Sequence, residues 1–66
     1  MSVKPYAEKL VLLRGKKSRS EVAEKLKISK SALAMYETGQ RVPRDEVKIA
    51  LAQFYGKTVE EIFFTN

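Results

Sequence analysis

Residues 18–39, SRSEVAEKLKISKSALAMYETG, hold the pattern that decides the fold. On each side of Lys27, apolar side chains recur at the three- and four-residue spacing that forms the inward face of an amphipathic helix. Ser18 and Ser29 stand just before the two apolar runs, where a serine hydroxyl can cap a helix. The segment therefore predicts two short helices, joined by a tight turn, that share one core. The inward residues are Val22, Ala23, Leu26, Ile28, Leu33 and Tyr36.

The expected helix ends in this segment support the same prediction. Ser18 and Glu21 have the spacing of a capping box, in which the serine oxygen and the glutamate carboxylate each accept a backbone N–H. Gly39 stands where a helix commonly ends in a left-handed residue, and Pro43 follows shortly after it. The second helix is therefore expected to be about nine residues long.

Further helices are predicted on both sides of this segment. One covers residues 5–14 and another covers about 44–54, each with apolar residues on one face. A short helix over about 58–64 begins at Thr58, which has capping-box spacing to Glu61. The predicted fold class is all-α, a compact five-helix bundle that forms a single domain over residues 1–66. The inward residues outside 18–39 are Tyr6, Leu10, Leu13, Val47, Leu51 and Phe54.

The composition excludes several classes of function. The chain of 66 residues contains no His and no Cys, so it lacks the usual general base, the thiol nucleophile and the commonest transition-metal ligands. We therefore expect neither an enzyme nor a metal or cofactor site. No apolar stretch approaches the roughly 18 residues that cross a bilayer. Because residues 1–4 lack the apolar core of a secretory leader, a cytoplasmic protein is expected.

Positive charge is concentrated in the first two thirds of the chain. Residues 1–44 carry a net charge of +7, whereas residues 45–66 carry −2. Such positive charge is often just the solvated face of a helix, but it can also attract nucleic acid. Because the cations surround the predicted pair of helices at 18–39, nucleic-acid binding is favoured.

The chain resembles the Xre and phage Cro/CI-type helix-turn-helix regulators over about residues 10–63. The resemblance implies a lambda-repressor-like DNA-binding bundle with the helix-turn-helix at its second and third helices. Two positions depart from the usual family pattern: Arg19 stands in place of Gln, and Lys27 stands in place of a turn glycine. A left-handed lysine at the turn would cost about 1 kcal/mol. The resemblance is carried by Leu13, Arg14, Glu21, Val22, Ala23, Leu26, Ile28, Ser29, Leu33, Tyr36, Glu37, Gly39, Pro43, Ile49, Ala50 and Ala52.

The resemblance implies which residues read DNA, because the third helix of such proteins lies in the major groove. Carried over by position, Lys30, Ser31, Ala34 and Met35 face base edges. Lys30 can donate to guanine O6 and N7, Ser31 can bond to several bases, and Met35 can pack against a thymine methyl. A solvated cation at Lys30 and a core position for Met35 are the alternatives.

Contacts with the DNA backbone are expected from the start of the second helix, the basic connector before it and the loop after the third helix. Arg41 is the candidate for the minor groove, and an ordinary exposed loop arginine is the alternative. The predicted backbone contacts are Lys16, Lys17, Arg19, Tyr36, Thr38, Gln40, Arg41 and Arg44.

A dimer is expected, since proteins with this motif bind paired half-sites on pseudo-palindromic DNA. The helix at about 58–64 is the predicted dimerisation element, with Ile62 and Phe64 at the interface. Alternatively, Phe64 folds back on its own subunit, or the last residues are frayed.

Together these observations predict a sequence-specific double-stranded DNA-binding transcriptional regulator, a homodimeric repressor of bacterial or phage type. The alternative is an antitoxin-like or partner-binding helical module.

Overall fold

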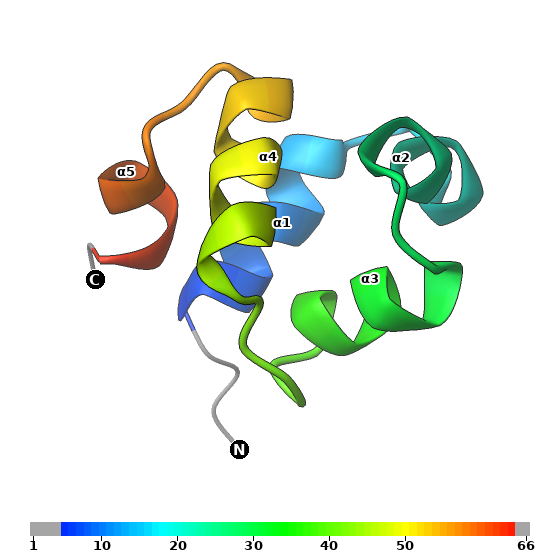
Figure 1. Cartoon of the computed structure of the whole chain (residues 1–66), viewed down its shortest axis with the longest axis horizontal. Coiled ribbons are helices and arrows are strands. Elements are labelled where there is room, and N and C mark those ends of the chain that lie inside the picture. The colour runs from blue at the N-terminus through cyan, green and yellow to red at the C-terminus, as the bar shows by residue number, and fades with distance from the viewer. Residues whose placement is uncertain (1–4, 65–66) are drawn as a thin grey trace.

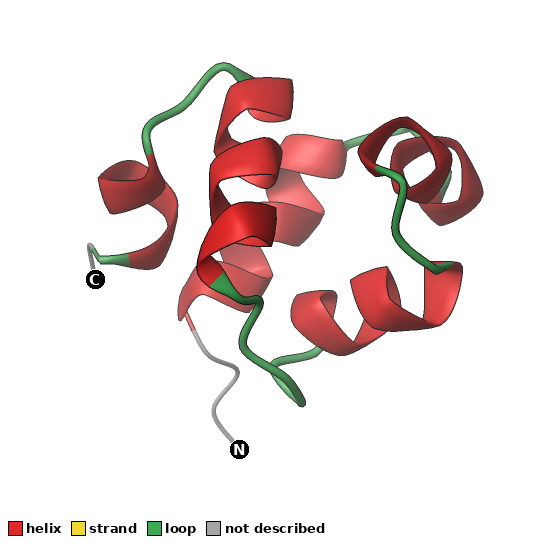
Figure 2. Ribbon diagram, viewed as in Figure 1, coloured by secondary structure: helices red, strands yellow, loops and turns green. Residues whose placement is uncertain are grey.

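The computed structural model describes residues 5–64, and within them every regular element is a helix (Figure 2). The all-α prediction is confirmed. Residues 1–4, on which the expectation about a secretory leader rested, lie outside the described residues. The helices are α1 (Pro5–Arg14), α2 (Arg19–Leu26), α3 (Lys30–Glu37), α4 (Asp45–Tyr55) and α5 (Val59–Phe63). All five helices have the bounds expected from the sequence to within about one residue; α4 begins and ends one residue later than predicted.

Helices α1 and α4 form the middle of the molecule (Figure 1). Helices α2 and α3 lie on one side of them, and α5 lies on the other. Helix α3 packs against α1 and α2, whereas α5 packs against α1 and α4. The helix-turn-helix and the last helix are therefore supported by the same two central helices but face different ways.

All five helices contribute to one core. The predicted inward residues either are fully buried or pack, half-buried, against the buried cluster. Ile62 is 1% exposed and belongs to this core, so its predicted place at a dimer interface is wrong. The helical pattern correctly marked Ile62 as apolar, but its side chain is used within the subunit. The buried cluster consists of Tyr6, Ala7, Leu10, Val22, Ala23, Leu33, Tyr36, Leu51, Ala52 and Ile62.

Hydroxyl caps begin the three helices for which the sequence predicted them. Ser18 Oγ accepts the Glu21 N–H at 3.0 Å, and Ser29 Oγ accepts the Ala32 N–H at 2.9 Å. A complete capping box forms at Thr58 and Glu61, where each side chain accepts the other residue's backbone N–H. The hydrogen bond from the Thr58 backbone N–H holds the pKa of the Glu61 carboxyl below its usual value.

Three helices end in the same way: the residue after a left-handed residue donates its backbone N–H to the carbonyl five residues earlier. Gly39 ends α3 with a φ of +77°, and Gly56 ends α4 with a φ of +69°. Lys27 takes the equivalent position after α2 with a φ of +60°. The Ile28 N–H donates to the Ala23 carbonyl at 3.0 Å, which closes the turn between α2 and α3. The expectation of a left-handed lysine is therefore confirmed.

Candidate nucleic-acid interface

Helix α3 presents one face to solvent and buries the other. Lys30 and Ser31 are exposed in its first turn, and Ala34 is half-buried beside them. Met35 is 37% exposed, so it does not belong to the core, and the alternative of a core position is excluded. The residues predicted to face base edges thus lie together on the exposed side of α3, while Leu33 is buried on the opposite side.

The orientation of α3 is fixed at its start and at its end. The Ser29 cap and the left-handed Lys27 set the angle at which the chain enters α3. At the other end, the Gln40 and Arg41 N–H groups both donate to the Met35 carbonyl, at 3.0 and 3.3 Å. Hydrogen bonds at both ends of α3 therefore fix the orientation of its exposed face.

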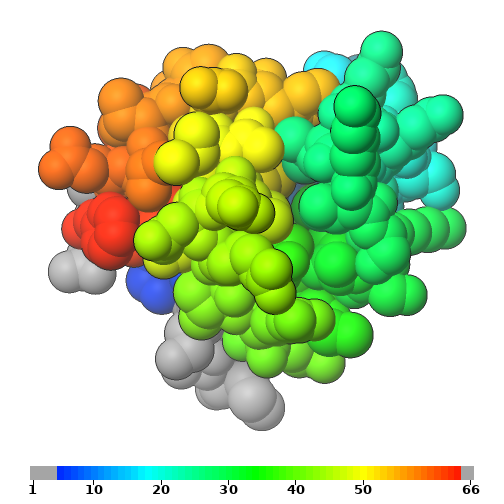
Figure 3. Space-filling view, viewed as in Figure 1, coloured from blue at the N-terminus to red at the C-terminus, as the bar shows by residue number. Residues whose placement is uncertain are grey.

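Exposed cations lie before α2 and after α3. Lys16 and Lys17 are in the connector between α1 and α2, and Arg41 and Arg44 are in the loop that leads into α4. All four are exposed. In the space-filling view, the green residues of α3 and the yellow-green residues of this loop adjoin on one face (Figure 3). This placement suits contact with phosphates on both sides of a groove occupied by α3.

The loop after α3 is held by side chains as well as by its backbone. The Thr38 hydroxyl donates to the Ala34 carbonyl at 2.9 Å. The Tyr6 hydroxyl, from α1, donates to the Arg41 carbonyl at 3.0 Å. Burial raises the pKa of Tyr6 above its usual value. Gln40, between these two anchored residues, is exposed.

Tyr36 and Tyr55 are both aromatic residues of the interior. Tyr36 is buried, as expected for an inward residue of α3. The Tyr55 hydroxyl is buried and, within residues 5–64, has no hydrogen-bond partner. Desolvation, with the charge of Glu37 nearby, raises the pKa of Tyr55 to about 12.

Glu37 forms ion pairs with two arginines. Its carboxylate is fully buried. Arg14 Nε lies 2.8 Å from one carboxylate oxygen, and Arg19 Nε lies 2.7 Å from the other. The partners are 23 and 18 residues away along the chain, beyond the reach of a local spacing rule.

The arrangement of α2, the Lys27 turn and α3 is that of a helix-turn-helix, and the family model described as helix-turn-helix matches residues 9–62. The chain belongs to the Cro/C1-type helix-turn-helix family. It is therefore a DNA-binding helix-turn-helix regulator. Neither a search of curated proteins nor a search of solved structures returned a match. Between residues 5 and 64, this helix-turn-helix protein has no helix long and apolar enough to cross a membrane.

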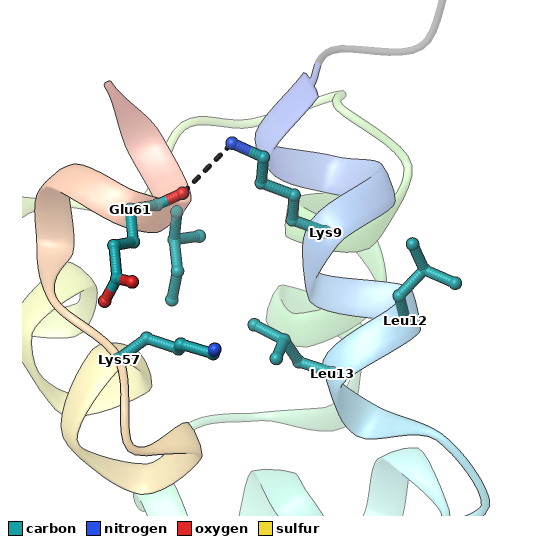
Figure 4. Close-up of a pocket in the computed structure, with 6 residues that line it drawn as sticks. Lys9, Leu12, Leu13, Lys57 and Glu61 are labelled. Atoms are coloured by element: carbon teal, nitrogen blue, oxygen red, sulfur yellow. Dashed lines mark hydrogen bonds between the residues drawn. The ribbon is translucent and has the colours of Figure 1, made fainter. Parts of the chain in front are cut away.

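A second surface feature of the helix-turn-helix protein lies away from α3. A groove of about 400 Å³ runs between α1 and α5 (Figure 4). Leu12 and Leu13 lie on its α1 side, and the Lys9 ammonium at one end donates to the Glu61 carbonyl at 3.0 Å. Leu12 is the most exposed large apolar residue of the described chain.

Phe64, at the end of α5, is 68% exposed. The Lys48 ammonium lies 5.4 Å from the centre of its ring and 5.6 Å from that of Phe63. The alternative that Phe64 folds back on its own subunit therefore holds only in part, since one side of the ring meets Lys48 and most of its surface is open.

Proposed function

We propose that this chain is a sequence-specific transcriptional repressor of bacterial or phage type that binds double-stranded DNA as a homodimer in the cytoplasm. The observation that carries the proposal is the exposed face of α3, where Lys30, Ser31 and Met35 are open to solvent in a helix fixed at both ends. Such side chains can read base edges in the major groove.

We propose that four residues on this face contact base edges, because of their positions along α3. Lys30 offers donors for guanine, and the small Ser31 and Ala34 allow close approach to the bases. Met35 supplies an apolar contact for a thymine methyl. The same face has no large aromatic side chain, so a helix could enter the groove without a steric obstacle.

Affinity is assigned to the cations around α3. Lys16, Lys17, Arg19, Arg41 and Arg44 are proposed to contact phosphates, together with polar groups of Tyr36, Thr38 and Gln40. Each neutralised phosphate releases counterions, so these cations predict a steep salt dependence, with a slope of about −4 to −5 per subunit.

We propose that the chain is a single domain that dimerises through α5. Phe64 is the residue at the contact. The subunit is at most 28 Å long, less than the roughly 34 Å between half-sites one helical turn apart. One subunit is therefore too short to reach both half-sites, and two are needed for a paired site. Because α5 lies on the far side of α1 and α4 from α3, pairing there leaves the reading faces uncovered (Figure 1).

The test is selection of binding sites from a random duplex library, followed by titration of the recovered sites at several salt concentrations. We expect a two-fold-symmetric consensus and a steep loss of affinity with salt. Recovery of no consensus, with weak binding to every duplex, would overturn the proposal.

A second candidate function, a partner-binding helical module, is favoured by the groove beside Leu12. Leu12→Ser tests it, because the Leu12 side chain is exposed and its loss should leave the core intact. If the protein acts only as a DNA reader, L12S should repress as well as the wild type in a reporter strain. Loss of repression with unchanged DNA affinity would instead indicate a protein partner at this groove.

A further inference from the structure

The Glu37 carboxylate lies where an isolated negative charge would be unfavourable. It is the last residue of α3, at the negative end of the helix dipole, and its side chain has no exposed surface. A buried carboxylate is stable only when it is paired and hydrogen-bonded. Arg14 and Arg19 supply this pairing, one on each carboxylate oxygen.

The two arginines come from the ends of two other helices. Arg14 is the last residue of α1, and Arg19 is the first residue of α2. Arg14 also donates from Nη1 to the Lys17 carbonyl at 2.7 Å, so it holds the connector between these helices. Through one carboxylate, the start of α2 is therefore tied to the end of the reading helix α3.

The two arginines differ in how much of their side chain reaches solvent. The Arg14 side chain is 17% exposed, whereas that of Arg19 is 37% exposed. Both bind Glu37 through Nε, and a guanidinium is a rigid plane with five donors. Fixing Nε of Arg19 on Glu37 therefore also fixes the direction of its terminal nitrogens, at the first turn of α2.

We propose that Glu37 is a positioning residue for DNA binding, which holds the Arg19 guanidinium in the orientation that binds a backbone phosphate at the start of α2. This inference rests on the proposed function. It gives a reason for Arg19 at a position where Gln is usual, since a guanidinium can bond a carboxylate through Nε and a phosphate through its terminal nitrogens at once. Phosphate contact and the placement of α3 then depend on the same three side chains.

If Glu37 has a different role, simple neutralisation of Arg19, the predicted change in DNA affinity on substitution of Glu37 has the opposite sign. If Glu37 only neutralised Arg19, then Glu37→Gln would free a positive charge and strengthen DNA binding. If Glu37 positions Arg19, the same substitution weakens binding although the protein gains positive charge. Glu24→Gln is the matched control, because Glu24 is an exposed residue of α2 and the change in charge is the same.

The experiment measures affinity for a recovered site and for a random duplex at several salt concentrations by fluorescence anisotropy. We expect E37Q to bind both duplexes about tenfold more weakly than the wild type, as for loss of one charged hydrogen bond. The salt slope should fall by about 0.9, as for one lost phosphate contact. E24Q should bind at least as tightly as the wild type.

Because E37Q disturbs a buried ion pair, circular dichroism first establishes that it is folded. Arg19→Lys supplies the second variant, since it keeps the charge and leaves the Arg14–Glu37 pair in place. A lysine ammonium cannot hold Glu37 and a phosphate in the same geometry, so R19K should also bind about tenfold more weakly. If E37Q is unfolded, the DNA affinity of R19K is the deciding measurement.

Wild-type affinity in R19K, or a folded E37Q that binds as tightly as E24Q, would overturn the positioning role. These outcomes leave the proposed function intact, because the wild type still binds DNA. A wild-type protein that binds neither duplex would overturn both proposals.

Discussion

The Tyr6 hydroxyl of α1 donates a hydrogen bond of 3.0 Å to the carbonyl oxygen of Arg41, 35 residues further along the chain. Through this bond, the central helix restrains the loop that carries Arg41. Tyr6→Phe keeps the ring in the core and removes only the bond. We expect a loss of about 1 kcal/mol in the free energy of unfolding, measured by urea denaturation. Faster amide hydrogen exchange in the loop should accompany it; unchanged exchange and stability would show that the bond does not restrain the loop.

Tyr55→Phe should have the opposite effect. The Tyr55 hydroxyl is buried without a partner among the described residues, so removing it eliminates a desolvation penalty. We expect the free energy of unfolding to rise by about 1 kcal/mol. The difference in the free energy of unfolding between Y55F and the wild type should grow at alkaline pH. The pKa of Tyr55 is raised from 10.0 to about 12 by burial first and by Glu37 second, so the unfolded chain loses the proton earlier than the folded chain.

The pH window for this effect follows from those two values. Below pH 10 the phenol is neutral in both states and contributes no pH dependence. Between pH 10 and 12, ionisation of the unfolded state lowers the stability of the wild type, whereas Y55F lacks this contribution. Denaturation curves at pH 8 and near pH 11 compare the two proteins. Parallel losses of stability in both would contradict the assignment to Tyr55.

Lys30 and Lys16 should respond differently to truncation. Lys30 lies on the reading face of α3, so Lys30→Ala should weaken binding to the recovered site by about 1–3 kcal/mol and relax the preference at one base position. Lys16 lies in the connector, and Lys16→Ala should weaken all duplexes alike and reduce the salt slope by about one unit. Equal losses on specific and random DNA for K30A would exclude a reading role for Lys30.

Lys27→Gly should stabilise the protein. Lys27 ends α2 in the left-handed conformation that Gly39 and Gly56 adopt at the ends of α3 and α4. Relief of the Cβ strain should raise the free energy of unfolding by about 0.5–1 kcal/mol. Lys25→Gly, in the last turn of α2, is the control and should destabilise by a similar amount because glycine is unfavourable within a helix. A loss of stability in K27G would show that Lys27 is not strained.

Phe64→Glu tests the proposed dimer contact. Phe64 is largely exposed, so the substitution should leave the fold intact and prevent burial of this ring between subunits. We expect a dimeric wild type and a monomeric F64E in sedimentation equilibrium. F64E should also lose affinity for a two-fold-symmetric site while retaining affinity for a half-site. An unchanged mass of F64E would show that the dimer interface lies on another surface.

The sequence predicted local features of this fold well, because their causes are local. Thr58 and Glu61 could be paired from their spacing, whereas the left-handed Lys27 was expected only from the family resemblance, which implies a glycine in that turn. The exposed position of Met35 followed from the inward stripe of its neighbours. The inferences about Met35 and about the Thr58–Glu61 pair need only the periodicity of a helix and the chemistry of its ends.

Features that depend on distant parts of the chain could not be predicted in this way. The pairing of Glu37 with both Arg14 and Arg19 requires the ends of three helices to meet. The depth of Ile62 in the core depends on how α5 packs against α1 and α4. The unpartnered hydroxyl of Tyr55 likewise results from packing, and nothing in its neighbours in the sequence marks it.

The central claim is that the exposed face of α3 reads DNA, and amide chemical-shift mapping tests it most directly. A ¹⁵N-labelled protein is titrated with a duplex recovered by selection and, separately, with a random duplex of equal length. We predict that the largest shifts on the selected duplex occur at Lys30, Ser31, Ala34 and Met35, and that the random duplex shifts mainly the connector and the loop after α3. Shifts centred on the groove between α1 and α5, with α3 unchanged, would contradict the account.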